Sequence, residues 1–210
     1  MVFTVLTVAL TVFYPATLTA ADGKQRLDSF FSELKSMRAH FVQTVIDGNG
    51  DVIEESRGTM ALLRPGRFNW HYLAPFEQRI VTDGKRLWIY DPDLDQVSIK
   101  PFDEGLGETP ALLLSGDTKV YERFDVRPLE ISGSEFEWLL LTPKEQQSGY
   151  ESVQLGFDQA GLRIVRFSDD FGHHTQIQFQ DIEANVSLAK DEFEFVAPAG
   201  VEVISDPALF

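Results

Sequence analysis

Residues that could support catalysis or bind a metal are few in this chain of 210 residues. Two of the four histidines, His173 and His174, are adjacent, and adjacent side chains of a strand point to opposite faces, so they cannot easily share a metal ion. The other two, His40 and His71, are isolated. The carboxylate pairs Asp169-Asp170 and Glu54-Glu55 occur in a very acidic chain, where solvated charges are more common than a glycosidase pair. We therefore expect no catalytic residue and no metal site. The residues considered for such sites are His40, His71, His173, His174, Glu54-Glu55 and Asp169-Asp170.

Sequence motifs of common enzyme classes are also missing. The chain has no G-x-S-x-G and no H-E-x-x-H, and neither Gly23-Lys24 nor Gly84-Lys85 is followed by the Ser or Thr of a phosphate-binding loop. It has no cysteine, which excludes disulfides, thiolate chemistry, Cys-ligated zinc and lipidation of the chain itself. We predict a binding protein without a cofactor. A periplasmic hydrolase stays an alternative, which requires two facing carboxylates with raised pKa.

The charge of the chain limits its partners. The formal net charge is −15 at pH 7. An acidic surface repels nucleic acid and anionic lipid headgroups. We expect no nucleic-acid partner and no membrane binding through charge.

The N-terminus begins with an uncharged apolar run over residues 2–14, followed by Pro15 and the small residues 19–21. A membrane-spanning helix needs about 20 apolar residues, so this run has the length of a signal-peptide core instead. No Lys or Arg precedes it, which is unusual for a signal peptide. We expect residues 1–21 to be a cleaved signal peptide and residues 22–210 to form a single exported domain. A retained anchor or a cytosolic protein with an apolar start are the alternatives.

Two periodicities indicate the elements that must position the functional side chains. Residues 22–38 predict an amphipathic helix, because large apolar residues recur at spacings of three and four. From about residue 39 the period changes to two, and turn signals follow at short intervals, which indicates an antiparallel meander. We predict a mainly β (α+β) fold, with one antiparallel sheet of about ten or eleven strands and a few helices. The apolar residues of the helix pattern are Leu27, Phe30, Phe31, Leu34, Met37 and Phe41.

A long antiparallel sheet curls, and its concave face must be filled. Residues 109–116 predict a short helix whose central Leu112 and Leu113 belong to a stretch that is apolar on every side, as in a plug or lid for the sheet. An ordinary core helix would explain the same pattern. The candidate lining residues alternate along strands, although the sequence does not say which face is concave. They are Phe68, Trp70, Leu87, Ile89, Ile177 and Phe179.

Arg64 precedes the Pro65-Gly66 turn and offers five hydrogen-bond donors in a rigid fork. A short helix leaves its last carbonyl groups unpaired. We therefore predict that Arg64 is a latch for the lid, bonded to the carbonyl groups near residues 113–115 when the protein is empty. An exposed arginine in a turn is the alternative.

Several short segments, in this order and over residues 26–205, resemble the LolA family of outer-membrane lipoprotein carriers. The resemblance implies an unclosed antiparallel half-barrel whose concave face is covered by helices. It also implies that Arg64 and Phe68 occupy positions involved in cargo handling and partner engagement. Gly66-Arg67 departs from the residues that other members often carry. The matching segments are Phe41-Val42-Gln43, Asp47-Gly48, Arg64-Pro65-Gly66-Arg67-Phe68-Asn69-Trp70, Val81-Thr82-Asp83-Gly84-Lys85, Leu87-Trp88-Ile89-Tyr90, Gly107-Glu108-Thr109-Pro110, Leu141-Thr142-Pro143-Lys144, Phe193-Glu194-Phe195 and Pro198-Ala199-Gly200-Val201.

The same resemblance implies a function. It implies a periplasmic, non-enzymatic carrier, which we expect to be a monomer. The carrier shelters the acyl chains of lipoproteins, takes them from an inner-membrane ABC-type release complex and passes them to the outer-membrane receptor LolB. A lipid or lipoprotein sensor of the same fold, which binds but does not shuttle, is the main alternative, and the hydrolase is the second.

Overall fold

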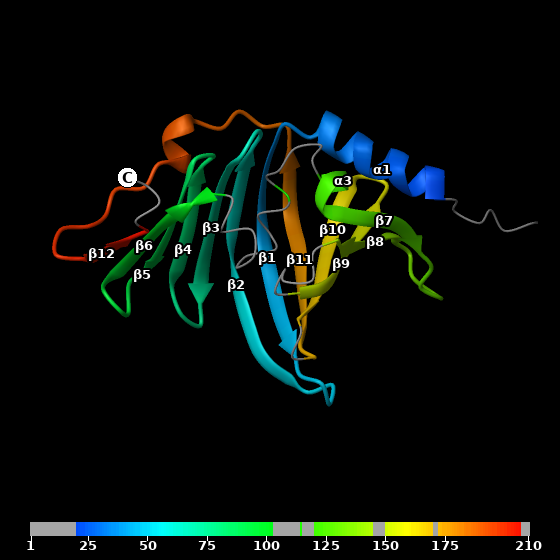
Figure 1. The fold of residues 1–210 in the computed structure, drawn as a ribbon, viewed down its shortest axis with the longest axis horizontal. Coiled ribbons are helices and arrows are strands. Elements are labelled where there is room, and N and C mark those ends of the chain that lie inside the picture. Colours follow the sequence, from blue (N-terminus) through cyan, green and yellow to red (C-terminus); the bar gives the residue numbers. More distant parts are fainter. Residues whose placement is uncertain (1–19, 103–113, 115–119, 145–149, 170–171, 207–210) are drawn as a thin grey trace, which may run out of the picture.

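A single curved sheet forms most of the protein (Figure 1). The structure, a computed structural model, describes residues 20–102, 114, 120–144, 150–169 and 172–206. Within these ranges the chain forms helix α1 (Ala20–Glu33), the short helix α3 (Val120–Arg123) and the 3-10 helix η2 (Lys190–Phe193). The strands are β1 (Ser36–Ile46), β2 (Val52–Leu63), β3 (Arg67–Ala74), β4 (Gln78–Asp83), β5 (Arg86–Asp91), β6 (Gln96–Pro101), β7 (Phe124–Leu129), β8 (Glu137–Pro143), β9 (Tyr150–Asp158), β10 (Gly161–Asp169), β11 (His174–Ala184) and β12 (Glu202–Ser205).

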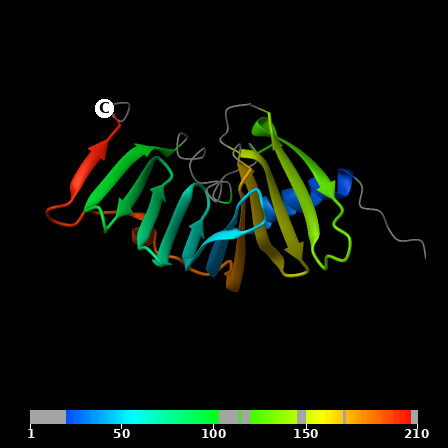
Figure 2. The ribbon, with the colours of Figure 1, turned by 90° about the horizontal axis from the view of Figure 1, so that it is seen from below.

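The strands pair in the order β12-β6-β5-β4-β3-β2-β1-β11-β10-β9-β8-β7. Neighbours are antiparallel, as expected of hairpins joined by short turns, except that β12 runs parallel to β6. Figure 2 shows the sheet as an arc, with β12 and β7 at its two ends. The predicted open half-barrel is confirmed. It has twelve strands rather than ten or eleven, and one of them is the four-residue β12 at the edge.

Helix α1 ends at Glu33, so the predicted helix over residues 22–38 was too long. Met37 lies in β1 and pairs with Leu62 of β2. Met37 and Phe41 fit a spacing of four, but they also fit a spacing of two, with buried Ala39 between them. The strand pattern therefore overlapped with the end of the helical one.

The two faces of the sheet carry separate apolar layers. The concave face packs against α1, whose Leu27 and Phe31 belong to the same buried cluster as its strand residues. On the convex face, the segment between β11 and β12 runs along the outside of the arc (Figure 2) and contacts β3 and β4 through η2. Phe193 of η2 is fully buried there, and Asn69 donates a hydrogen bond to the carbonyl oxygen of Glu192 (2.7 Å).

Candidate functional site

The six described lining residues predicted from alternation share one face of the sheet. Leu62, Phe68 and Thr82 are cross-strand partners, Thr82 pairs with Leu87, and cross-strand partners point to the same side. This side is the concave one that packs against α1. Their role in lipid binding stays a prediction. Leu112 and Leu113 lie outside the described residues. The six residues on the concave face are Phe68, Trp70, Leu87, Ile89, Ile177 and Phe179.

An aromatic cluster occupies the centre of the concave face. The ring of Trp70 stacks on Phe41 at a centroid distance of 3.9 Å and lies 5.5 Å from Phe68. Phe179 and Tyr72 contact it edge-on at 6.2 and 6.0 Å. Sequence reasoning missed Phe41 as a lining residue because it had assigned Phe41 to the helical pattern.

Strands β8 to β10 extend the apolar face into the other half of the sheet, and sequence reasoning missed their contribution. Leu139 and Leu141 of β8 are fully buried and pair with Leu155 and Val153 of β9. Leu155 pairs in turn with Val165 of β10. In β8 the residues Trp138 to Leu141 are apolar without interruption, so period-two alternation gives no signal there.

Arg64 joins the end of helix α1 to Leu114, both of which pack against the concave face. Its Nε and Nη2 donate hydrogen bonds to the carbonyl oxygen of Leu114 (3.2 and 2.9 Å). Its Nη1 lies within hydrogen-bond distance of three carbonyl oxygens at the end of α1, those of Phe30 (2.9 Å), Phe31 (3.1 Å) and Leu34 (3.0 Å). The contact near residues 113–115 is therefore present, and the contact with α1 was not expected. The role of Arg64 as a latch stays a prediction.

The surroundings of Arg64 are apolar. The guanidinium lies 4.6 Å from the ring centroid of Phe30 and 4.7 Å from that of Phe31. Burial lowers its pKa to about 10, so the group stays positively charged at neutral pH. Leu114, which receives two of its hydrogen bonds, is 2% exposed and belongs to the same buried cluster as the sheet. A charged group thus holds an apolar side chain in place through its backbone.

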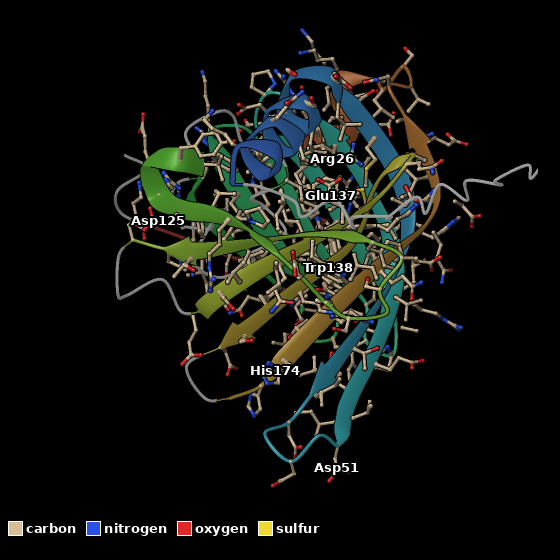
Figure 3. The ribbon with its side chains drawn as sticks, turned by 90° about the vertical axis from the view of Figure 1, so that its right-hand side faces the viewer. Arg26, Asp51, Asp125, Glu137, Trp138 and His174 are labelled. Carbon is tan, nitrogen blue, oxygen red and sulfur yellow. The ribbon has the colours of Figure 1, made fainter. Side chains whose placement is uncertain are left out.

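The first half of α1 is attached to strands β8 and β9, in the other half of the arc. Arg26 donates to the carbonyl oxygen of Asp158 and forms an ion pair with Glu137 of β8 at 3.5 Å (Figure 3). The Tyr121 hydroxyl of α3 donates to Asp28 (2.8 Å), which also pairs with Lys24 (2.7 Å). Hydrogen bonds from Lys24 and Tyr121 lower the pKa of Asp28, and burial together with Asp28 raises that of Tyr121.

Acidic and basic groups are dispersed over the described part of the chain. Its histidines have separate partners: His40 with Asp181, His71 with Glu77, His173 with Asp169 and His174 with Ser168. Within the described ranges, no group of three or more His, Asp or Glu could hold a metal ion. No helix there has the length and apolar character needed to cross a membrane.

The hydrolase alternative requires a carboxyl group with a raised pKa. The described carboxyl groups with a resolved shift move in the opposite direction. Backbone hydrogen bonds from Asp51 and Asn49 lower the pKa of Asp47. For Asp158, burial acts to raise the pKa, but the hydrogen bonds from Arg163 and the backbone outweigh it and the net shift is downward. These groups therefore give no support for a catalytic acid.

Comparison with known proteins identifies the family of this chain. The family model described as outer membrane lipoprotein carrier protein LolA matches residues 32–196. An outer-membrane lipoprotein carrier protein from Methylobacillus flagellatus is 40% identical over 186 residues, which cover 89% of this chain and 90% of the relative. The carrier of the same name from Pseudomonas syringae pv. tomato is 42% identical over 190 residues, 89% and 90% of the two chains.

Solved structures support the fold. An uncharacterized conserved protein from Thermus thermophilus aligns with a TM-score of 0.56 at 15% identity, over 89% of this chain and 99% of that one. A LolA superfamily protein from Nitrosomonas europaea aligns with a TM-score of 0.51 at 13% identity, over 85% and 99%. At these identities the likeness concerns the fold alone. Together with the family model and the relatives, it shows that this chain belongs to the LolA family of outer-membrane lipoprotein carrier proteins.

Proposed function

We propose that this protein is a periplasmic carrier that shelters the acyl chains of outer-membrane lipoproteins on the concave face of its sheet. One observation carries the proposal. The concave face is apolar across both halves of the arc, and its cover of α1 and Leu114 is tied to the sheet by Arg64 through carbonyl groups. Such contacts can be broken and made again without unfolding the sheet.

The energy of lipid transfer explains why an apolar face is needed. Each methylene group withdrawn from a lipid environment into water costs about 0.8 kcal/mol, so one 16-carbon chain costs on the order of 12 kcal/mol. A carrier has to recover most of this free energy with apolar contacts of its own. The buried residues of strands β1 to β5 and β8 to β11 supply such contacts once the cover moves aside.

The cargo must also be released, so its binding to the carrier must not be too favourable. The hydrogen bonds of Arg64 oppose cargo binding. Cargo that displaces Leu114 breaks the hydrogen bonds between its carbonyl oxygen and the guanidinium. At roughly 0.5–1.5 kcal/mol for each bond, and more for a charged donor, opening costs a few kcal/mol. The same free energy is regained when the cargo leaves, so the closed empty state favours release.

The partners in this proposal follow from the family. The protein receives lipoproteins from an inner-membrane ABC-type release complex and delivers them to the receptor LolB. The sequence has no nucleotide-binding motif, so the energy for loading comes from the release complex. The acidic chain would approach such partners without adhering to anionic lipid surfaces.

A release assay tests the proposal. Purified mature protein is incubated with spheroplasts, and the soluble fraction is probed for an outer-membrane lipoprotein. We expect lipoprotein in that fraction, bound to the protein, and transfer to outer-membrane vesicles that contain LolB. A protein that binds lipopeptide but leaves the lipoprotein on the spheroplasts would be the non-shuttling sensor, and the carrier proposal would be wrong.

A further inference from the structure

Three polar side chains converge within the apolar concave face: Trp70, Tyr72 and Gln43. Trp70 is fully buried, and its Nε1 has no hydrogen-bond partner in the described structure. The Tyr72 hydroxyl donates to Gln43 Oε1 at 3.0 Å. Burial raises the pKa of Tyr72 to about 12, while the nearby indole N–H and Gln43 act in the opposite direction. The indole N–H is therefore close to the Tyr72 hydroxyl, although the two do not form a hydrogen bond of normal geometry.

The position of the indole is set by the strands around it. Trp70 and Tyr72 lie on β3 and Phe41 on β1, with β2 between them. Gly58 of β2 lies between these side chains, and a Cβ there would approach the Phe41 ring to 2.7 Å. The absence of a side chain at Gly58 lets the Phe41 ring reach across β2 and stack on Trp70. The indole is thus held between rings, and its orientation is not free.

An unpaired indole N–H at a fully buried position is unusual. Buried tryptophans normally find an acceptor, because an unmade hydrogen bond leaves the desolvation of the N–H uncompensated. Trp138, on the convex face, follows this rule and donates to Ser134 Oγ at 2.7 Å. The difference between the two tryptophans indicates that the acceptor for Trp70 comes from outside the described part of the chain.

The chemistry around Trp70 defines that acceptor. An indole N–H only donates, so the ligand must present an acceptor atom. The neighbouring aromatic rings require that the acceptor be attached to hydrocarbon. The full burial of Trp70 disfavours an anionic carboxylate at this place, because desolvating a charge is costly. A neutral carbonyl group at the head of an acyl chain meets all three conditions.

We propose that Trp70 Nε1 donates a hydrogen bond to the ester carbonyl oxygen of a bound acyl group, beside Tyr72 and Gln43. The concave face then recognises acyl esters and not hydrocarbon chains alone. This inference rests on the proposed carrier function and specifies its ligand. The carbonyl could belong to the lipid-modified cysteine of a lipoprotein or to a phospholipid, since both carry acyl esters.

The test compares an ester with an ether. A cysteine lipopeptide that carries a dipalmitoylglyceryl group is matched with an analogue that carries a dihexadecylglyceryl group, which lacks both carbonyl groups. We expect the ester to bind about three- to tenfold more tightly, as one hydrogen bond allows. In the 15N-labelled protein, the indole N–H signal of Trp70 should move downfield with the ester and much less with the ether.

Two variants isolate the N–H group. Trp70→Phe should lose the ester preference, and so should a protein with benzothienylalanine at position 70, which keeps the shape of indole without the N–H. Trp88→Phe, on the convex face between Leu87 and Ile89, is the control and should keep the preference. Retention of the preference by the benzothienyl variant would overturn the inference.

The outcomes separate this inference from the proposed function. Equal binding of ester and ether, with lipoprotein release from spheroplasts intact, would refute carbonyl recognition and leave the carrier function standing. Binding of neither lipopeptide would count against both. A matched ester and ether pair of phosphatidylethanolamine identifies the source of the carbonyl. The same preference in that pair would indicate that the glycerol ester itself is recognised, and a preference confined to the lipopeptide would assign the carbonyl to lipoprotein cargo.

Discussion

The two faces of the sheet are covered in different ways. On the concave face, α1 and Leu114 are joined through the single side chain of Arg64, which bonds to backbone carbonyl groups. On the convex face, the C-terminal segment buries Phe193 completely and then pairs β12 with β6. Hydrogen bonds of the first kind exchange with water at a small net loss, whereas withdrawal of a buried aromatic ring costs several kcal/mol. The concave cover also buries Leu27, Phe31 and Leu114, but a bound acyl chain would replace their contacts with the sheet. We therefore expect the concave cover to open and the convex one to stay.

The largest effect is expected from Phe68→Glu. Phe68 is fully buried in the concave face, so the variant places an unpaired carboxylate among apolar side chains. We expect the free energy of unfolding to fall by several kcal/mol, and we expect loading from the release complex to fail. Urea unfolding and the spheroplast assay measure the two effects. Phe68→Leu is the matched control, which keeps an apolar side chain and should load, and unimpaired loading by Phe68→Glu would remove this position from the lipid site.

Phe193→Ala should act on stability alone. Loss of the fully buried ring should lower the free energy of unfolding by about 3–5 kcal/mol. Protein that remains folded should still bind lipopeptide, because the concave face is unchanged. Val196→Ala, at a position that is 87% exposed, is the control and should have almost no effect in the same urea titration. A large loss of lipid affinity in folded Phe193→Ala would show that the two covers are not independent.

Arg64→Leu should have a smaller effect on stability and a specific one on release. Its hydrogen bonds to α1 and Leu114 are lost, so the empty closed state is destabilised by about 1–3 kcal/mol. Cargo should then bind more tightly and be handed over to LolB more slowly, as measured by transfer to receptor-containing vesicles. Arg67→Leu, three residues along at the start of β3, is a suitable control. Normal transfer with unchanged cargo affinity would contradict the latch.

The smallest effect concerns the attachment of α1 to α3 through Asp28. Hydrogen bonds lower the pKa of Asp28 below 3.8 in the folded protein, so its stabilising contribution is present above that value and lost as the pH falls through the folded pKa. The difference in stability between wild type and Asp28→Asn should be constant at neutral pH and shrink below about pH 4. Urea unfolding as a function of pH measures it. A difference that grows on acidification would show that the assigned sign is wrong.

Much of the sheet and of the candidate site could be predicted from local patterns. Phe68, Trp70 and Tyr72 alternate with polar residues, and this alternation predicted a strand with one apolar face, which β3 has. The pattern failed where two periods coincide, at Met37 and Phe41, and where no polar residue interrupts the strand, in β8. In both places pairing with neighbouring strands decides the structure, and that pairing is not a local property.

The sequence by itself determined an antiparallel sheet and the apolar residues available to line a site, because alternation and turn residues act over a few positions. The resemblance of short ordered segments to one family gave the family and the open form of the sheet. Only the tertiary structure decided which side of each strand is concave, since that depends on where α1 packs. It alone brought Arg64 to the end of α1, and it alone left the indole N–H of Trp70 without a partner among the described residues. Contacts of this kind join residues far apart in the chain, and spacing along the sequence does not encode them.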